Sequence, residues 1–75
     1  MPPDDLIAAF GLAVRRARTE LGLSQEGFAS LAELDRTYVS SLERGKRNPT
    51  LATQHRLAKA LGYRLSALIQ EAEEV

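Results

Sequence analysis

The sequence predicts an all-α protein, a compact single domain of five short helices that spans residues 1–75. Apolar residues recur at intervals of three and four along most of the chain, which is the spacing of one helix face. No run alternates between apolar and polar residues with a period of two, the pattern of a half-buried strand. Valine, which is common in strands, occurs only at positions 14, 39 and 75.

The first helix is expected to begin at Asp4 or Asp5, because a carboxylate accepts hydrogen bonds from the exposed N–H groups of a first helical turn. Gly22 ends this helix, since glycine adopts the left-handed conformation that commonly follows a helix. The residues between them that have the spacing of a buried face are Leu6, Phe10, Ala13, Val14, Ala17 and Leu21.

The second and third helices are predicted on either side of a connection of only three residues. Ser24 and Asp35 supply the capping side chains, and Gly45 ends the third helix. Ala29 is small enough for the two helices to approach where they cross, and Leu34 in the turn is able to fill the corner. The side chains expected to face inward are Phe28, Leu31, Ala32, Val39 and Leu42.

A basic loop, "KRNP" (Lys46–Pro49), separates the third helix from the fourth, because proline prevents a helix from continuing through it. Thr50 caps the fourth helix and Gly62 ends it. The predicted buried stripe of that helix is Leu51, Leu57, Ala58 and Leu61. Ser66 is expected to cap a fifth helix over residues 66–74, whose apolar residues include Leu68, Ile69 and Ala72.

The formal net charge is zero, yet the charges are unevenly distributed. All ten basic residues lie between Arg15 and Arg64, and this interval holds only five acids, which gives it a formal charge of +5. The other five acids lie near the two ends, at Asp4, Asp5, Glu71, Glu73 and Glu74. A basic body of this kind attracts phosphate, whereas charges of both signs scattered evenly over the surface would not.

The composition argues against several classes of function. There is no cysteine, and therefore no disulfide, thiol nucleophile or cysteine-bound metal, and there is no glycine-rich phosphate loop. His55 and Tyr63 are expected to be partly buried packing residues. We therefore expect neither an enzyme nor a metal, a cofactor or a small-molecule ligand. The longest apolar run, Leu6–Val14, is far shorter than the ~20 residues of a membrane span, so a cytoplasmic location is expected.

Residues 24–45, with two short helices and a three-residue turn, have the proportions of a helix-turn-helix. The longer stretch "LGLSQEGFASLAELDRTYVSSLERGKRNPTLATQHRLAKALG" resembles the DNA-binding domain of the Cro/C1-type (Xre-like) regulators, a resemblance that extends from about Ala13 to Leu68. Within it, "LDRTYVSSLERGKRN" is especially similar to the controller proteins of restriction–modification operons. The resemblance implies a lambda-repressor-like fold that binds double-stranded DNA.

The resemblance also implies which residues contact DNA. Gln25, at the start of the second helix, matches a glutamine that touches a DNA phosphate. The residues of the third helix that would face the major groove are Arg36, Thr37, Tyr38, Ser40 and Ser41. The residues that match a loop gripping the DNA backbone are Arg44, Lys46, Arg47 and Asn48. Arginine donates two parallel hydrogen bonds to guanine, and lysine and the hydroxyl side chains donate to phosphate. Outside this motif, the same side chains would be read as an ordinary solvated helix face.

Three other positions stand out against the family pattern. Glu43 corresponds to a glutamate that usually pairs with an arginine of the first helix, here Arg18. Glu33 occupies a turn position that is usually glycine, because the backbone there is left-handed. Gly27 stands inside the second helix, where glycine costs about 1 kcal/mol relative to alanine.

One recognition helix reads too few base pairs for specificity, so the resemblance implies a homodimer on a two-fold symmetric site. The apolar residues expected to form the dimer interface are Leu65, Leu68, Ile69 and Ala72. The predicted function is sequence-specific transcriptional regulation, and the resemblance implies a restriction–modification operon as the target. The alternative is a protein-interaction module of the same fold, such as an antitoxin that binds a toxin. After Gln70 the sequence continues only with "EAEEV", which argues against the extra tail that such antitoxins commonly carry.

Overall fold

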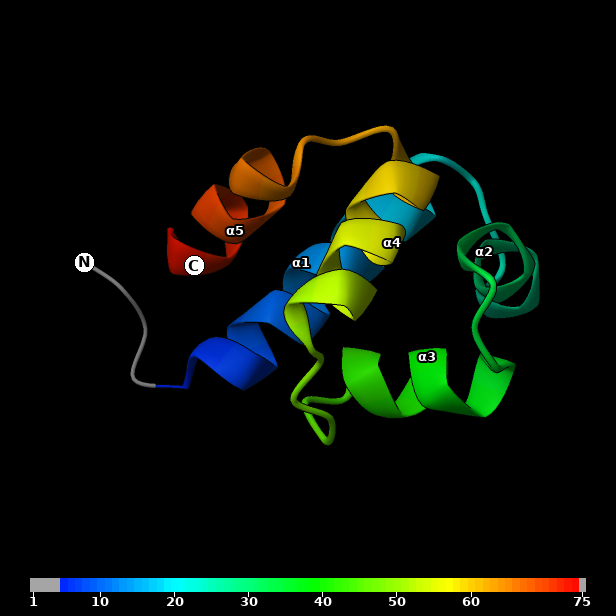
Figure 1. Cartoon of the computed structure of the whole chain (residues 1–75), viewed down its shortest axis with the longest axis horizontal. Coiled ribbons are helices and arrows are strands. Elements are labelled where there is room, and N and C mark those ends of the chain that lie inside the picture. The colour runs from blue at the N-terminus through cyan, green and yellow to red at the C-terminus, as the bar shows by residue number, and fades with distance from the viewer. Residues whose placement is uncertain (1–4, 75) are drawn as a thin grey trace.

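The computed structural model describes residues 5–74, and within this range the chain forms five α-helices and no β-strand. The helices are α1 (Leu6–Glu20), α2 (Gln25–Ala32), α3 (Arg36–Glu43), α4 (Leu51–Leu61) and α5 (Leu65–Glu73). In Figure 1, α1 and α4 occupy the middle of the molecule, with α5 on one side and the α2–α3 pair on the other. The predicted all-α fold is confirmed.

Most of the predicted helix boundaries are confirmed because they depend on local hydrogen bonds. The side chains of Asp5, Ser24, Asp35 and Thr50 each accept a backbone N–H bond from the first turn of the following helix. The three glycines that follow helices all have positive φ, namely Gly22, Gly45 and Gly62. Asp4, the alternative start of the first helix, lies outside the described residues.

The predicted start of the last helix was wrong. The N-cap of α5 is Arg64, which makes no side-chain capping bond, and Ser66 lies within the first turn. The end of α4 explains this difference. Gly62 and Tyr63 donate their backbone N–H groups to the carbonyls of Lys59 and Ala58. This closure reverses the chain within three residues, so that α5 begins before the serine is reached.

The core contains side chains from all five helices. The largest fully buried ones are Phe28, Leu42, Leu57, Leu68, Val14 and Val39. Four leucines that were predicted to be buried are instead 44–70% exposed, namely Leu6, Leu21, Leu31 and Leu51. Each lies in the first or last turn of a helix or directly after it. His55 was also predicted to be partly buried and is exposed, whereas Tyr63 is half-buried as predicted.

The helix α3 packs against α1 through an unusually close backbone approach at Gly11. A Cβ atom at this position would lie only 2.1 Å from the carbonyl oxygen of Leu42 and 3.2 Å from that of Glu43. Gly45 makes a similar approach, because a Cβ atom there would lie 3.0 Å from the Cα atom of Ala8. The C-terminal end of α3 therefore packs against α1 at a distance that only glycine at positions 11 and 45 permits.

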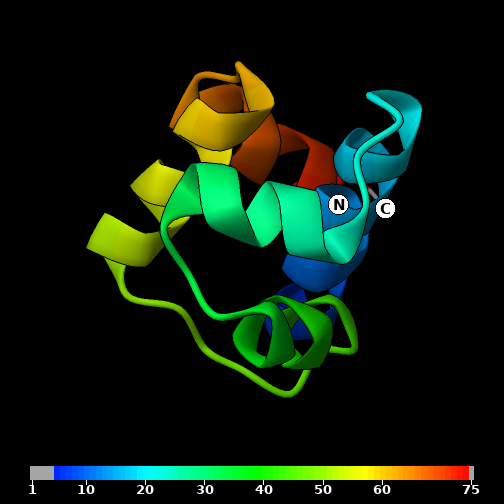
Figure 2. The same ribbon diagram turned by 90° about the vertical axis from the view of Figure 1, so that its right-hand side faces the viewer.

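The short connection between α2 and α3 makes the two helices cross steeply. In Figure 1 α2 is viewed nearly end-on while α3 lies across the view, and in Figure 2 the two exchange these orientations. Ala29 is buried at the crossing and Leu34 is half-buried against the core, as predicted. Glu33 adopts the left-handed conformation, with φ 57° and ψ 44°. The helix-turn-helix predicted for residues 24–45 is thus present.

Candidate nucleic-acid interface

One side of α3 is buried and the other side faces solvent. Val39, Leu42 and Glu43 hold the helix against the core. On the opposite side the side chains of Arg36 and Thr37 are exposed, and those of Tyr38, Ser40 and Ser41 are partly exposed. The helix lies at the lower edge of the molecule in Figure 1, with no other helix beyond it. This is the arrangement that allows a helix to enter a DNA groove.

At the N-terminal end of α3, Asp35 orders the first turn. Its carboxylate accepts hydrogen bonds from the backbone N–H of Thr37, at 2.8 Å, and from the Thr37 hydroxyl. These bonds lower the pKa of Asp35 below its ordinary value. The guanidinium of Arg36 makes no hydrogen bond within the described residues, so it remains able to reach a base or a phosphate.

The loop after α3 is held against the exposed side of the helix. Arg44 donates a hydrogen bond from Nη1 to the Ser40 hydroxyl at 2.7 Å. The Arg47 guanidinium lies 5.4 Å from the centre of the Tyr38 ring, within the range of a cation–π interaction. Lys46 and Asn48 are exposed beside them. The structure therefore brings the predicted helix and loop residues onto one continuous surface.

The predicted ion pair between Arg18 and Glu43 is present and is buried at the base of this surface. Arg18 donates from Nε to Glu43 Oε2 at 2.6 Å and from Nη2 to Oε1 at 2.9 Å, while Nη1 donates to the Leu23 carbonyl at 2.8 Å. Only 9% of Arg18 and 8% of Glu43 is exposed. The hydrogen bonds that Arg18 donates to the Glu43 carboxylate raise the pKa of Arg18 above its ordinary value, despite the opposing effect of burial.

Gln25 is joined to the same ion pair, a contact that the sequence did not reveal. Its Nε2 donates to Glu43 Oε1 at 3.1 Å, and its side chain is half-buried. Glu43 therefore accepts hydrogen bonds from side chains of both α1 and α2. This network positions Gln25, the first residue of α2, relative to α3.

The charge of the surface suits a polyanion. Residues 36–48 include four cationic side chains, at Arg36, Arg44, Lys46 and Arg47. The one acid in this segment, Glu43, is buried and paired with Arg18. The surface is therefore strongly positive even though the whole chain has no net charge, and such a surface attracts DNA phosphates.

A family model for helix-turn-helix proteins matches residues 14–68, which is more than half of the chain. The chain belongs to the Cro/C1-type helix-turn-helix family. It is therefore a DNA-binding transcriptional regulator, and this family is not a family of enzymes. The resemblance noted from residues 13–68 is thus confirmed along almost all of its length.

Within this family, several relatives are controller proteins. The control protein C.MunI of a Mycoplasma species is 42% identical over 72 residues, which cover 95% of this chain and 97% of that protein. The control protein C.BamHI of Bacillus amyloliquefaciens is 41% identical over 61 residues, or 80% of this chain and 75% of that protein. The crystal structure of the restriction–modification controller protein C.AhdI from Aeromonas hydrophila matches with a TM-score of 0.81 and 45% identity, covering 88% and 98% of the two chains.

The predicted dimer interface of this helix-turn-helix protein is only partly available to a partner. Leu68 and Ala72 are fully buried, because α5 turns this face toward the core of its own chain. Including these two residues in the interface was wrong. Leu65 and Ile69 are half-buried and pack at the border of the core. Ile69 also lines a shallow cavity of about 130 Å³ together with Leu6, Ile7 and Phe10 of α1.

Residues 5–74 lack two further features. They contain no group of three or more His, Asp or Glu side chains arranged to hold a metal ion. No helix among them has the length and apolar character needed to cross a membrane.

Proposed function

We propose that this chain is a homodimeric regulator of a restriction–modification operon, which reads a two-fold symmetric DNA site with α3. The observation that supports the operon is the 42% identity to a control protein over almost the full length of both chains. A dimer is proposed because one short helix contacts too few base pairs to select a site. Since such a regulator works where the DNA lies, we also propose a cytoplasmic location.

The proposed DNA contacts fall into two groups. Arg36 reads a base, because it opens α3, is exposed and makes no hydrogen bond within residues 5–74. Thr37, Tyr38, Ser40 and Ser41 lie on the same exposed side and complete the groove-facing surface. The residues that contact the DNA backbone are Gln25, Arg44, Lys46, Arg47 and Asn48. Arg44 and Arg47 are held against α3 by their intramolecular contacts, which favours a fixed position on the phosphates.

The proposed dimer interface combines the half-buried residues of α5 with the neighbouring end of α1. Leu6 and Ile7 are large apolar side chains with about two fifths of their surface exposed, and they border the same shallow cavity as Ile69. Leu65 lies one helical turn before Ile69. Together these four residues form an apolar patch, called here the α1–α5 patch.

Binding to the DNA upstream of its own gene would test the proposed function. A footprint there should protect two half-sites related by a two-fold axis. Arg36→Ala should weaken operator binding by about 1–3 kcal/mol and relax the preference at one base pair of each half-site. Arg47→Ala should weaken binding to every sequence alike and lower the salt slope by about two per dimer, since each protomer loses one phosphate contact.

Titrations of the operator and a base-substituted copy at several salt concentrations distinguish these roles. If Arg36→Ala weakens binding to the two duplexes equally, Arg36 contacts phosphate. The base contacts must then come from Thr37, Tyr38 or Ser41. If neither variant changes DNA binding, α3 is not the reading helix, and an antitoxin-like interaction module becomes the better account.

The dimer is tested by comparing two apolar-to-acid substitutions. Ile69→Glu places a charge in the α1–α5 patch, so it should shift the protein toward monomer and weaken operator binding. Leu51→Glu is the matched control, because Leu51 is 70% exposed and lies outside this patch. Sedimentation velocity at micromolar concentration measures the oligomeric state of both. A full dimer with Ile69→Glu would place the interface elsewhere.

A further inference from the structure

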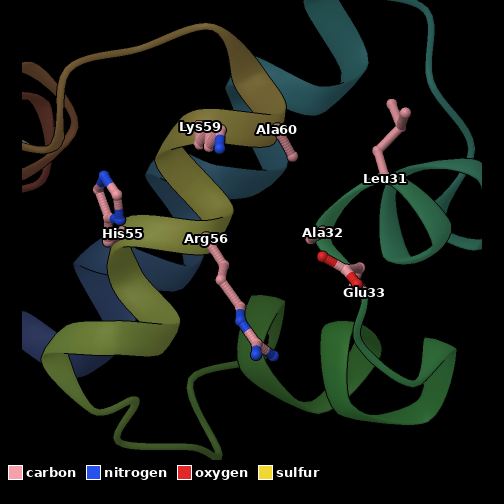
Figure 3. Close-up of a pocket in the computed structure, with 7 residues that line it drawn as sticks. All are labelled: Leu31, Ala32, Glu33, His55, Arg56, Lys59 and Ala60. Carbon is pink, nitrogen blue, oxygen red and sulfur yellow. The ribbon is translucent and has the colours of Figure 1, made fainter.

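An open groove of about 500 Å³ lies between α2 and α4. It is lined by Leu31, Ala32, Glu33, His55, Arg56, Lys59 and Ala60, and is called here the α2–α4 groove. Figure 3 shows Leu31 and Glu33 on the α2 side, with the side chains of α4 across the gap. None of the proposed DNA-contacting residues lines this groove. It is therefore a second surface of the protein, separate from the proposed DNA interface.

The two walls of the groove differ in chemistry. On the α2 side, Leu31 leaves 60% of its surface exposed, although leucine is among the residues most often buried. On the α4 side, His55, Arg56 and Lys59 are all exposed, and none of their side chains forms a hydrogen bond or ion pair within residues 5–74. The helix α4 contains no acidic residue that could neutralise them. Between the walls lie the small side chains of Ala32 and Ala60.

We propose that the α2–α4 groove binds an acidic segment of a partner protein. Carboxylates of that segment pair with Arg56 and Lys59, and an aliphatic side chain packs over the two alanines against Leu31. Charge complementarity supports this occupant, since the groove combines unpaired cations with exposed apolar surface. A DNA backbone fits less well, because it offers no aliphatic side chain to pack against Leu31.

The α2–α4 groove lies beside the turn that leads into α3, so a bound partner would be able to affect DNA binding. Glu33 lies in the turn that joins α2 to α3, so an occupant of the groove contacts the segment that precedes the recognition helix. None of the proposed DNA-contacting side chains lines the groove, so an occupant of the groove does not compete with DNA for those side chains. The regulator would therefore be able to hold DNA and the partner protein at the same time.

A nuclear magnetic resonance titration tests the proposal directly. The probe is a short synthetic peptide with leucines on one face of a helix and glutamates on the other. Its control peptide has glutamine in place of every glutamate. The acidic peptide should shift the backbone amide signals of residues 31–33 and 55–60, whereas the glutamine peptide should leave them unchanged. Shifts confined to α3 and residues 46–48 would overturn the proposal, because the peptide would then be acting as a mimic of DNA.

Matched variants make the test specific for the groove. Replacing Arg56 and Lys59 by glutamine should weaken peptide binding by about tenfold or more. The control replaces Arg15 and Arg16, two exposed arginines of α1, by glutamine, and so removes the same net charge elsewhere. Leu31→Ser should also weaken binding, through loss of apolar contact. Equal weakening by both double variants would overturn the proposal, since only overall charge would then matter.

Two further measurements complete the experiment. Both double variants should bind a duplex of random sequence with equal affinity, because neither pair belongs to the proposed DNA surface. Weaker DNA binding by the groove variant than by its control would assign the groove to DNA and overturn the proposal. The amide signals of the groove could also shift when only the protein concentration is raised, with no such shift in the groove variant. That result would overturn the proposal, because the occupant would then be a second copy of this chain.

Discussion

The two ends of α3 are held in contrasting ways. The C-terminal end is fixed by a buried ion pair and by the backbone approach at Gly11, both of which involve α1. The N-terminal end has no such anchor, and its first turn is ordered mainly by the exposed cap Asp35. The angle of the helix is thus set at one end, while the side chains proposed to contact bases, Arg36 and Thr37, lie at the other. If this proposal is right, sequence preference is able to change at these two positions without a change in the fold.

The largest effect is expected at Gly11. In Gly11→Ala the new methyl group would overlap the Leu42 carbonyl, so α1 and α3 must move apart and the surrounding core must loosen. Overpacking of this kind typically costs about 1–3 kcal/mol, and a clash with rigid backbone belongs at or above the upper end of that range. The free energy of unfolding, measured with urea, should fall by about 3 kcal/mol, and DNA binding should weaken with it.

Gly27→Ala is the control for this substitution. Gly27 also lies within a helix, but a Cβ atom there would meet only the Ser24 hydroxyl at 3.2 Å. Alanine gains about 1 kcal/mol in helix propensity, and a small displacement of Ser24 offsets part of it. The stability of this variant should therefore change by less than about 1 kcal/mol. Similar losses from both glycine variants would show that helix spacing at Gly11 is not the cause.

A loss of stability of similar size is expected from the ion pair. Arg18→Ala leaves the buried Glu43 carboxylate without its charge partner, and removal of one member of a buried pair costs about 3 kcal/mol or more. It also removes the donor to the Leu23 carbonyl. The control is Arg16→Ala, an exposed arginine of the same helix, which should change stability by less than about 0.5 kcal/mol.

A double-mutant cycle sharpens this prediction. Replacing both Arg18 and Glu43 by uncharged residues of similar size removes the pair without leaving an isolated charge. The double variant should therefore recover much of the stability lost by Arg18→Ala, as measured by urea unfolding. Simple additivity of the two single losses would show that the two side chains contribute independently, and the anchor would then lie at Gly11 alone.

The contrast between the ends of α3 also explains what sequence reasoning found and missed. The caps Ser24, Asp35 and Thr50 were predicted correctly because a cap depends only on residues within one turn. The ion pair of Arg18 and Glu43 was predicted from the family resemblance, because two residues 25 positions apart show no local pattern that indicates a contact. The contacts of Gly11 and of Gln25 with α3 were missed, because they depend on how the finished helices sit against each other.

Errors in the predicted core follow the same logic. Helical periodicity shows which side of a helix an apolar residue occupies, but it does not show where the neighbouring helix ends. Leu31 and Leu51 have suitable spacing but lie near helix ends and remain exposed. For α5 the error was the reverse, because Leu68 and Ala72 were assigned to a partner and are used by the chain's own core. One sequence cannot distinguish an apolar face turned inward from one turned toward another molecule.

A smaller effect is expected at the N-terminal cap, and it depends on pH. The pKa of Asp35 is lower in the folded chain than in the unfolded chain, because the charged carboxylate accepts hydrogen bonds from Thr37. Its stabilisation is therefore complete above the unfolded pKa and is lost as the pH falls through the folded pKa. Asp35→Asn keeps a good capping side chain but does not titrate. Urea unfolding at about pH 7 and about pH 3 should show a smaller acid-induced loss in this variant than in the wild type.

The smallest effect concerns the turn that leads into α3. Glu33 has positive φ, which costs a residue with a Cβ atom about 1 kcal/mol, and Glu33→Gly removes this strain. Most of the gain is offset because glycine has greater conformational freedom in the unfolded chain. The net rise in stability should be a few tenths of a kcal/mol, seen as a small increase in Tm with unchanged DNA affinity.

Glu33→Ala separates the backbone from the charge, because alanine removes the carboxylate and keeps the strained conformation. If strain alone matters, Tm should rise in Glu33→Gly and stay at the wild-type value in Glu33→Ala. Equal increases in both would instead identify the loss of the carboxylate as the cause. A fall in Tm with Glu33→Gly would mean that freedom at this turn weakens the N-terminal end of α3. The turn would then help to hold the N-terminal end of α3 in place. The two ends of α3 would therefore differ less in rigidity than the packing of Gly11 and Arg18 indicates.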